Sequence, residues 1–306
     1  MINTSDVRDA ARRLEGRLRR TPVFATAPDR WFKLEYLQHA GSFKTRGMFN
    51  QVLAGVERGA VPAAGIVAAS GGNAGLAAAY TARELGITAE VYVPVTAPAV
   101  KVAKLGKLGA RVVQAGGEYA EAYAAATVRA EQTGALFCHA YDDPAMVAGN
   151  GTIGLELAEQ LPDGFDTVLV AVGGGGLIAG VIAALRDRAR IVAVEPATSR
   201  ALGAALAAGG PVDVPVSGVA ADSLGARRSG RIAYEMAADA GITSVLVEDT
   251  AIVEARRRLW DEHRIVVEHG TAAAQAALIS GVYRPEPGER VVVLLCGANS
   301  DPADLA

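Results

Sequence analysis

Short apolar runs rich in valine and alanine recur along this chain, and stretches with helical periodicity separate them. Eight runs predict strands, at 65–69, 89–94, 110–114, 135–138, 167–172, 190–195, 243–247 and 290–296. Strands that are apolar throughout are typical of parallel sheets covered by helices on both faces. The pattern therefore predicts an α/β protein with parallel-rich twisted sheets flanked by helices.

A long helical stretch at about 143–160 separates the first four predicted strands from the last four. This interruption predicts two sheets and two domains. We expect a small domain at 48–143 and a large domain formed by 1–47 and 144–306. In α/β proteins ligands bind beyond the carboxyl ends of parallel strands and between domains, so we expect the chemistry there.

The composition excludes several classes of protein. The 306 residues are 51% hydrophobic with a net charge of -3, which indicates a well-packed protein without a basic surface for nucleic acid. Apolar runs are broken by glycine or charge before they could span a bilayer, so we expect a cytoplasmic protein without membrane or nucleic-acid partners. The two cysteines, Cys138 and Cys296, provide neither a disulfide framework nor zinc-ligand spacing.

A lysine stands in the segment Gly41-Ser42-Phe43-Lys44-Thr45-Arg46-Gly47, at a predicted junction between a loop and a helix. The ε-amine of lysine forms a Schiff base with a carbonyl cofactor, and a helix start attracts anions. Four other lysines lack such surroundings: Lys33, Lys101, Lys104 and Lys107. We interpret Lys44 as the candidate catalytic residue, with an exposed basic helix start as the alternative if the segment stood alone.

The segment Ser70-Gly71-Gly72-Asn73-Ala74-Gly75 follows a predicted strand and opens a helix. Consecutive glycines let backbone N–H groups approach an anion, and the helix dipole favours a carboxylate or phosphate. The alternative is a tight turn in which Asn73 only caps the helix.

Four glycines, Gly173, Gly174, Gly175 and Gly176, precede Leu177 at the start of another predicted helix. Such a run forms a nest of N–H donors for a phosphate. It also fits, with Ala179, the G-x-G-x-x-A dinucleotide fingerprint, and Glu195 ends the next strand where a ribose-binding acid would lie. A nicotinamide-dependent oxidoreductase is therefore a competing interpretation.

Cys296 ends the last predicted strand, where a thiol offers a weak hydrogen bond to a ring nitrogen. A buried strand-end cysteine is more often a small core residue. Lys44 nevertheless favours pyridoxal phosphate over a nicotinamide, because hydride transfer needs no such lysine. A phosphate loop, a carboxylate loop, a lysine for the aldehyde and a polar strand end account for all four segments together.

In this order the segments resemble the fold-type II pyridoxal-phosphate enzymes, whose fold is tryptophan synthase β-like, and within them the serine/threonine dehydratase (threonine ammonia-lyase) family. The likeness covers nearly the whole chain and includes Glu35-x-x-Gln38-x-x-Gly41-Ser42-Phe43-Lys44-x-Arg46-Gly47. It implies that Lys44 binds the cofactor as a Schiff base, and that Phe43 and Ser223 cover the two faces of its ring. The cofactor would also contact Asn73 at its phenolic oxygen, Gly173 to Gly176 with Leu177 at its phosphate, and Cys296 at its pyridine nitrogen.

The resemblance also implies the substrate and cation sites. The substrate carboxylate would bind Ser70, Gly72, Asn73 and Ala74. Magnesium-binding members carry an aspartate six residues after the glutamate, where this chain has Ala201. We therefore expect a monovalent cation, K⁺ or Na⁺, held by Glu195 and by backbone carbonyls near Ser199 and Ala201.

The function implied is pyridoxal-phosphate-dependent β-elimination of L-threonine and/or L-serine to 2-oxobutyrate or pyruvate and ammonia, by a homodimer. Racemases of this family place a serine two residues before the asparagine, where this chain has Gly71, which argues against racemisation. His269 follows Glu268 where relatives usually have proline, so the preferred substrate stays open. Alternatives are another lyase or a racemase of this fold (threonine synthase-like or serine racemase), a nicotinamide-dependent oxidoreductase, or an amino-acid-binding protein.

Overall fold

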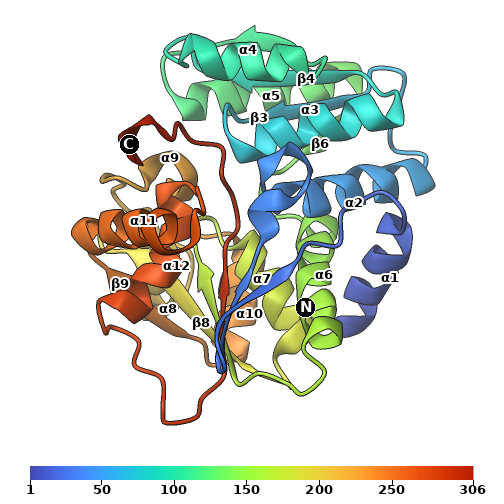
Figure 1. Ribbon diagram of the computed structural model, residues 1–306. Coiled ribbons are helices and arrows are strands. Elements are labelled where there is room, and N and C mark those ends of the chain that lie inside the picture. The colour runs from blue at the N-terminus through green and yellow to red at the C-terminus, as the bar shows by residue number, and fades with distance from the viewer. Residues whose placement is uncertain (306) are drawn as a thin grey trace.

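Two separate sheets organise the protein in the computed structural model, which describes residues 1–305 (Figure 1). In the described residues, six strands form the larger sheet in the order β1-β2-β10-β7-β8-β9, and four form the smaller one in the order β5-β4-β3-β6. The strands are β1 Val23–Ala27, β2 Arg30–Lys33, β3 Ile66–Ala69, β4 Ala89–Val93, β5 Arg111–Gln114, β6 Leu136–Cys138, β7 Thr167–Ala171, β8 Arg190–Pro196, β9 Thr243–Val247 and β10 Val291–Leu294. All neighbours pair in parallel except β1 with β2.

Helices separate most of these strands along the chain. They are α1 Thr4–Leu14, α2 Lys44–Glu57, α3 Asn73–Leu85, α4 Ala99–Lys107, α5 Tyr119–Thr133, α6 Pro144–Gln160, α7 Gly176–Leu185, α8 Ala201–Ala208, α9 Ala221–Leu224, α10 Arg231–Asp239, α11 Asp249–His263 and α12 His269–Ile279. Short 3-10 turns lie at Glu35–Leu37, His39–Gly41 and Ala303–Leu305. Among residues 1–305, none of these helices combines the length and the apolar character that crossing a membrane requires.

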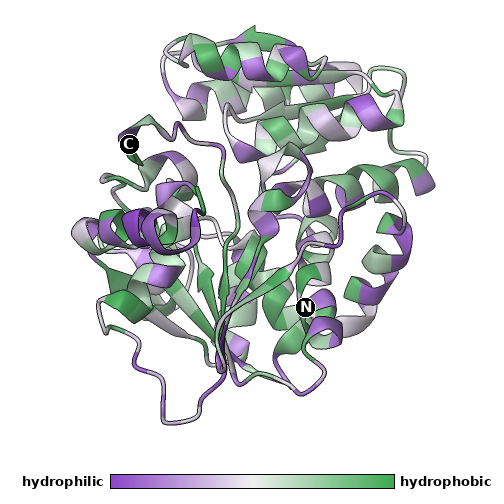
Figure 2. Cartoon of the chain, viewed as in Figure 1, coloured by the Kyte–Doolittle hydropathy of each residue, from purple (hydrophilic) through white to green (hydrophobic). Residues whose placement is uncertain are grey.

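The alternation of side chains along the central strands explains why they are apolar throughout. On β7, Val168 and Val170 pack into a core with α1, α6, α7 and α10, whereas Leu169 and Ala171 pack into a second core with α11 and α12. Both faces of the sheet are thus buried, as expected for parallel strands between helical layers. Figure 2 shows hydrophobic colouring along these strands and hydrophilic colouring on the outer helices α1 and α11. The predicted α/β class is confirmed, and the eight predicted strands correspond to β3–β10.

The smaller sheet contains the strands between residues 66 and 138, and it lies at the top of Figure 1 with α3, α4 and α5. The larger sheet takes its strands from residues 23–33 and 167–294. The helix predicted between the two sets of strands is α6. The domain limits of 48–143 for the small domain, and 1–47 with 144–306 for the large one, stay a prediction.

The N-terminal segment holds two features that sequence reasoning missed. Strands β1 and β2 form an antiparallel pair, and β2 joins β10 in parallel with Arg30 opposite Val291. The second feature is Lys33, and the expectation that Lys44 alone among the lysines has a defined environment is wrong. The side chain of Lys33 is fully buried, and Nζ donates to Glu156 Oε2 at 2.6 Å and to Gln160 Oε1 at 2.8 Å.

Candidate active site

Lys44 begins α2 directly beside the end of β10. Ser42 forms an isolated bridge with Gly297, and the N–H of Phe43 donates to the carbonyl of Cys296 at 3.0 Å. Gly41, with φ +72°, comes just before this contact, and a Cβ there would lie 2.7 Å from Asn299 Oδ1. The backbone around Lys44 is therefore fixed against the chain that follows β10.

The amine of Lys44 has one acceptor among the described residues, the carbonyl oxygen of Ala140 at 2.7 Å. Its Nζ also lies 5.0 Å from the centroid of the Phe43 ring. Burial is the main cause that lowers the pKa of Lys44 to about 8, although Cys296 and Glu268 act in the opposite direction. Roughly a tenth of such amines are uncharged at pH 7, so Lys44 can act as a nucleophile and as a base.

The predicted carboxylate loop connects β3 to α3. Ser70 Oγ accepts a hydrogen bond from the N–H of Gly72 at 3.2 Å, and α3 begins at Asn73 with Gly72 as a cap that has no side chain. Within residues 1–305 the N–H groups of Asn73, Ala74 and Gly75 have no acceptor. The first turn of α3 therefore offers free donors and a favourable dipole to an anion.

The four-glycine loop connects β7 to α7 and has the shape that a phosphate requires. Gly175 adopts φ +91°, and the N–H groups from Gly174 to Leu177 have no acceptor within residues 1–305. Added Cβ atoms at Gly174 and Gly176 would lie 2.5 Å from the Tyr141 ring and 2.6 Å from its carbonyl oxygen. Glycine is thus required by close packing, and the free donors form a nest that fits the phosphate of pyridoxal phosphate.

Asn73 lies in a chain of hydrogen bonds that sequence reasoning did not find. Its Nδ2 donates to Glu268 Oε1 at 2.7 Å, and its Oδ1 accepts from Asn299 Nδ2 at 2.7 Å. Glu268 is buried, and burial is the main cause that raises its pKa to about 7. Glu268 precedes His269 and Asn299 lies three residues after Cys296, but no spacing rule connects either residue to Asn73.

Cys296 and Ser223 lie close to the same cluster. Cys296 is buried with its Sγ 3.2 Å from Thr271 Oγ1, and burial raises the pKa of its thiol to about 12, which keeps it neutral. Ser223 Oγ accepts from the N–H of Gly270 at 3.2 Å. Since Gly270 precedes Thr271 at the start of α12, this helix links both side chains.

His269 is the first residue of α12 and lies beside the C-terminal segment, with its Nε2 4.0 Å from Asp304 Oδ2. The side chain is partly exposed. Burial lowers the pKa of the His269 imidazole, and Arg256 adds to this effect.

The residues predicted to bind a cation form a separate group near the ends of β8 and β9. Glu195 is fully buried, and its carboxylate accepts from the N–H groups of Leu202 and Gly203 and from Ser244 Oγ at 2.7–2.8 Å. Ser199 Oγ donates to the carbonyl of Leu224 at 2.7 Å, and Ala201 begins α8. Among residues 1–305, no three His, Cys, Asp or Glu side chains are grouped as metal ligands. The monovalent cation stays a prediction.

This arrangement also bears on the nicotinamide interpretation. The carboxylate of Glu195 is directed at α8 and β9, whereas a ribose-binding acid would face the glycine loop. The sequence therefore contains the glycines of the dinucleotide fingerprint, but the carboxylate of Glu195 does not face the glycine loop as a ribose-binding acid would.

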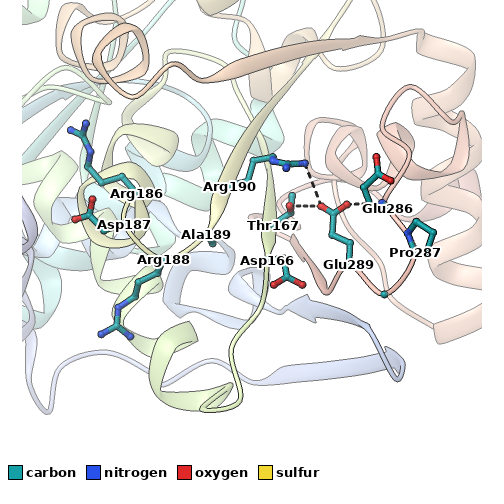
Figure 3. Close-up of a pocket in the computed structure, with 11 residues that line it drawn as sticks. Asp166, Thr167, Arg186, Asp187, Arg188, Ala189, Arg190, Glu286, Pro287 and Glu289 are labelled. Atoms are coloured by element: carbon teal, nitrogen blue, oxygen red, sulfur yellow. Dashed lines mark hydrogen bonds and ion pairs between the residues drawn. The ribbon is translucent and has the colours of Figure 1, made fainter.

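A pocket of about 690 Å³ is lined by residues that do not belong to this cluster (Figure 3). Thr167 and Arg190, the first residues of β7 and β8, line it, so it lies at the end of the sheet opposite the glycine loop. Its buried carboxylate, Glu289, accepts from Thr167 Oγ1 at 2.5 Å and from the N–H of Glu286 at 2.7 Å. Within this pocket Glu289 is held by Thr167 and by the backbone of Glu286, whereas Arg186 pairs outside it with Asp239.

Known proteins resemble this chain over nearly its full length. An L-threonine ammonia-lyase of Geobacter sulfurreducens is 37% identical, over 98% of this chain and 76% of its own length. A phenylserine dehydratase of Ralstonia pickettii is 36% identical, over 96% of this chain and 92% of its own length. The solved structure of maize serine racemase superposes with a TM-score of 0.92 at 30% identity, covering 99% of this chain and 95% of the racemase.

The family whose members are described as pyridoxal-phosphate dependent enzymes matches residues 15–297. This range includes Lys44, the carboxylate loop, the four-glycine loop and Cys296. The cofactor inferred from the free N–H groups and the buried lysine is thus the one that defines the family. The chain belongs to the pyridoxal-phosphate dependent enzymes of fold type II.

Proposed function

We propose that this protein is a pyridoxal-phosphate-dependent ammonia-lyase that converts L-threonine and/or L-serine to 2-oxobutyrate or pyruvate and ammonia. One observation carries the proposal. The amine of Lys44 donates to the carbonyl of Ala140, next to Tyr141, which packs against the four-glycine loop. Glu268, whose charge acts on the pKa of Lys44, accepts a hydrogen bond from Asn73 at the start of α3. Two relatives with the names L-threonine ammonia-lyase and phenylserine dehydratase support it.

Pyridoxal phosphate supplies an electron sink for the pair of electrons left at Cα when its proton is removed. The residues assigned to hold it are Phe43, Lys44, Asn73, Gly173, Gly174, Gly175, Gly176, Leu177, Ser223 and Cys296. A neutral thiol at Cys296 would place no charge beside the pyridine nitrogen of the bound cofactor. This setting favours prompt elimination over reactions that need a long-lived carbanion.

The substrate carboxylate is assigned to Ser70, Gly72, Asn73 and Ala74 at the start of α3. Free N–H groups and the positive end of the helix dipole orient it there. With its carboxylate held there, an L-amino acid would present its Cα–H bond to the amine of Lys44. An uncharged Lys44 accepts this proton, which is general base catalysis by a group whose pKa is close to the working pH.

The net reaction balances without an oxidant. The β-hydroxyl leaves as water, and a second water molecule hydrolyses the released enamine to the keto acid and ammonia. A monovalent cation at Glu195, Ser199 and Ala201 and a homodimeric assembly complete the proposal and rest on the resemblance described above. A cytoplasmic location is also proposed, and it rests on the apolar pattern of the sequence.

A racemase is the second candidate, because maize serine racemase is among the similar structures. The racemases of this family use a serine at the position of Gly71. A Cβ at Gly71 would lie 3.5 Å from Val93 Cγ1, so a side chain would fit, but none is present. Lys44 then serves one face of Cα only, which favours elimination over inversion.

The test is an assay of keto-acid release across a panel of hydroxy-amino acids, with chiral chromatography of the remaining substrate. We expect 2-oxobutyrate or pyruvate to accumulate from the L-enantiomers with little D-serine. D-serine that accumulates as fast as pyruvate would assign the protein to the racemases instead.

A further inference from the structure

We propose that Glu268 and Asn299 are positioning residues that hold the Asn73 amide in one orientation, so that its second N–H donates to the phenolic oxygen of pyridoxal phosphate. This inference rests on the proposed function, in which Asn73 contacts that oxygen. Two observations support it: the hydrogen bonds among the three side chains, and the space that two glycines leave for them.

The three side chains come from distant parts of the chain. Asn73 is the first residue of α3, beside the smaller sheet, whereas Glu268 precedes α12 and Asn299 follows β10. Asn299 Nδ2 donates both to Asn73 Oδ1 and to the carbonyl of Ala40, each at 2.7 Å. The second bond anchors Asn299 to the segment that leads into Lys44.

Counting donors and acceptors shows what remains for a ligand. The amide of Asn73 has two N–H groups and one carbonyl oxygen. Glu268 accepts from Nδ2, and Asn299 donates to Oδ1. Within residues 1–305 the other N–H of Nδ2 has no protein acceptor, which makes it the donor that is free for the cofactor.

The two partners also decide which way the amide faces. Rotation of the Asn73 amide by 180° would place its oxygen against the carboxyl oxygen of Glu268 and its NH₂ against the NH₂ of Asn299. With Glu268 ionised, both hydrogen bonds would be lost, and an oxygen would replace the free donor. A protonated Glu268 could donate to the rotated oxygen, but the NH₂ of Asn299 can only donate, so Asn299 fixes the orientation whatever the charge on Glu268.

Two glycines leave the space that these side chains occupy. A Cβ at Gly297 would lie 2.5 Å from Glu268 Oε1 and 3.3 Å from Asn73 Nδ2. A Cβ at Gly41 would lie 2.7 Å from Asn299 Oδ1. A side chain at Gly41 or Gly297 would therefore collide with the hydrogen-bonded side chains of Asn73, Glu268 and Asn299.

Three variants and a control test the assignment. Asn299→Asp keeps the size of the side chain but replaces the NH₂ donor with an oxygen, and Glu268→Leu removes the acceptor. Glu268→Gln keeps an acceptor and is the conservative rescue. Ser300→Ala is the control beside Asn299, because Ser300 Oγ bonds only the carbonyl of Val267, at 3.5 Å, within the described residues.

The readouts are the dissociation constant of pyridoxal phosphate and the position and pH titration of the visible absorption of the cofactor bound to Lys44. We expect Asn299→Asp and Glu268→Leu to weaken cofactor binding by about tenfold, the effect of one lost hydrogen bond, and to shift the absorption. Glu268→Gln and Ser300→Ala are expected to stay within about twofold of the wild type.

Unchanged affinity and absorption in Asn299→Asp would overturn the inference, and this near-isosteric variant decides even if Glu268→Leu does not fold. A thermal melt of each apo protein separates lost positioning from lost folding. A wild-type protein that binds no pyridoxal phosphate would instead contradict the proposed function.

Discussion

The buried charges around Arg46 give the sharpest prediction about stability. Arg46 lies one helical half-turn after Lys44 in α2, and its guanidinium forms paired hydrogen bonds with Glu35 at 2.7–2.8 Å and with Glu156 at 2.7–2.9 Å. Lys33 adds a second cation against Glu156. The two cations balance the two carboxylates, and only Glu156 keeps a modest exposed fraction, 17%.

The change is Arg46→Met, which keeps the apolar stem and removes the charge. Burial alone would lower the pKa of Arg46, but Glu35 and Glu156 raise it above its usual value. Without Arg46, two carboxylates in the protein interior share Lys33 alone, and removing one member of a buried ion pair costs about 3–5 kcal/mol. With an unfolding entropy of about 2.1 cal/mol/K per residue over 306 residues, the midpoint falls by about 5–8 °C.

Thermal melts of the apo protein measure this effect. Arg83→Met is the matched control, because Arg83 pairs with Glu84 on the surface and should cost less than about 1 kcal/mol. The double variant Arg46→Met, Glu35→Gln removes one charge of each sign, so it should recover at least half of the loss. If Arg46→Met melts at the temperature of the control, the argument that α2 is held by these charges is refuted.

Three further predictions use other parts of the structure. Gly174→Ala should cost about 1–3 kcal/mol and weaken cofactor binding, because the new Cβ meets the Tyr141 ring; Gly106→Ala, whose Cβ has no neighbour within 4 Å, should melt at or slightly above the wild-type temperature, because it lies inside α4 and alanine favours a helix. The folded pKa of Glu268 is raised to about 7 from 4.5, so its contribution to apo stability is complete below about pH 4.5 and is lost as the pH rises through 7; the melting point of the wild type relative to Glu268→Gln should fall over that interval, and a constant difference would contradict the burial of Glu268. Keto-acid release should rise with K⁺ and survive EDTA, whereas complete loss on chelation that Mg²⁺ restores would show that the site at Glu195 binds a divalent ion.

Much of the fold was predictable because local sequence determines it. The strands β3, β7 and β10 are buried along their whole length, so their apolar runs stand out from the helices between them. The glycine loops were predictable for a similar reason, since close packing excludes side chains at Gly174 and Gly176. These features need no knowledge of distant contacts.

The missed features depend on partners far away in the chain. Strand β2 contains Arg30 and Lys33 and is short, so it shows no strand pattern until β10 pairs with it. Lys33 is buried because Glu156, 123 residues away, accepts from it. Asn73 donates a hydrogen bond to Glu268, 195 residues away, and no local pattern in the sequence predicts that contact.

The central claim is that Lys44 is both the anchor of pyridoxal phosphate and the base that removes the Cα proton. The most direct test measures keto-acid release from L-threonine and L-serine by Lys44→Ala, with Lys104→Ala, an exposed lysine of α4, as the control. The account predicts that Lys104→Ala behaves as the wild type, with a visible absorption band of the bound cofactor that borohydride abolishes. Lys44→Ala is expected to fold, to release no keto acid and to lack this band. Turnover by Lys44→Ala near the wild-type rate would contradict the account.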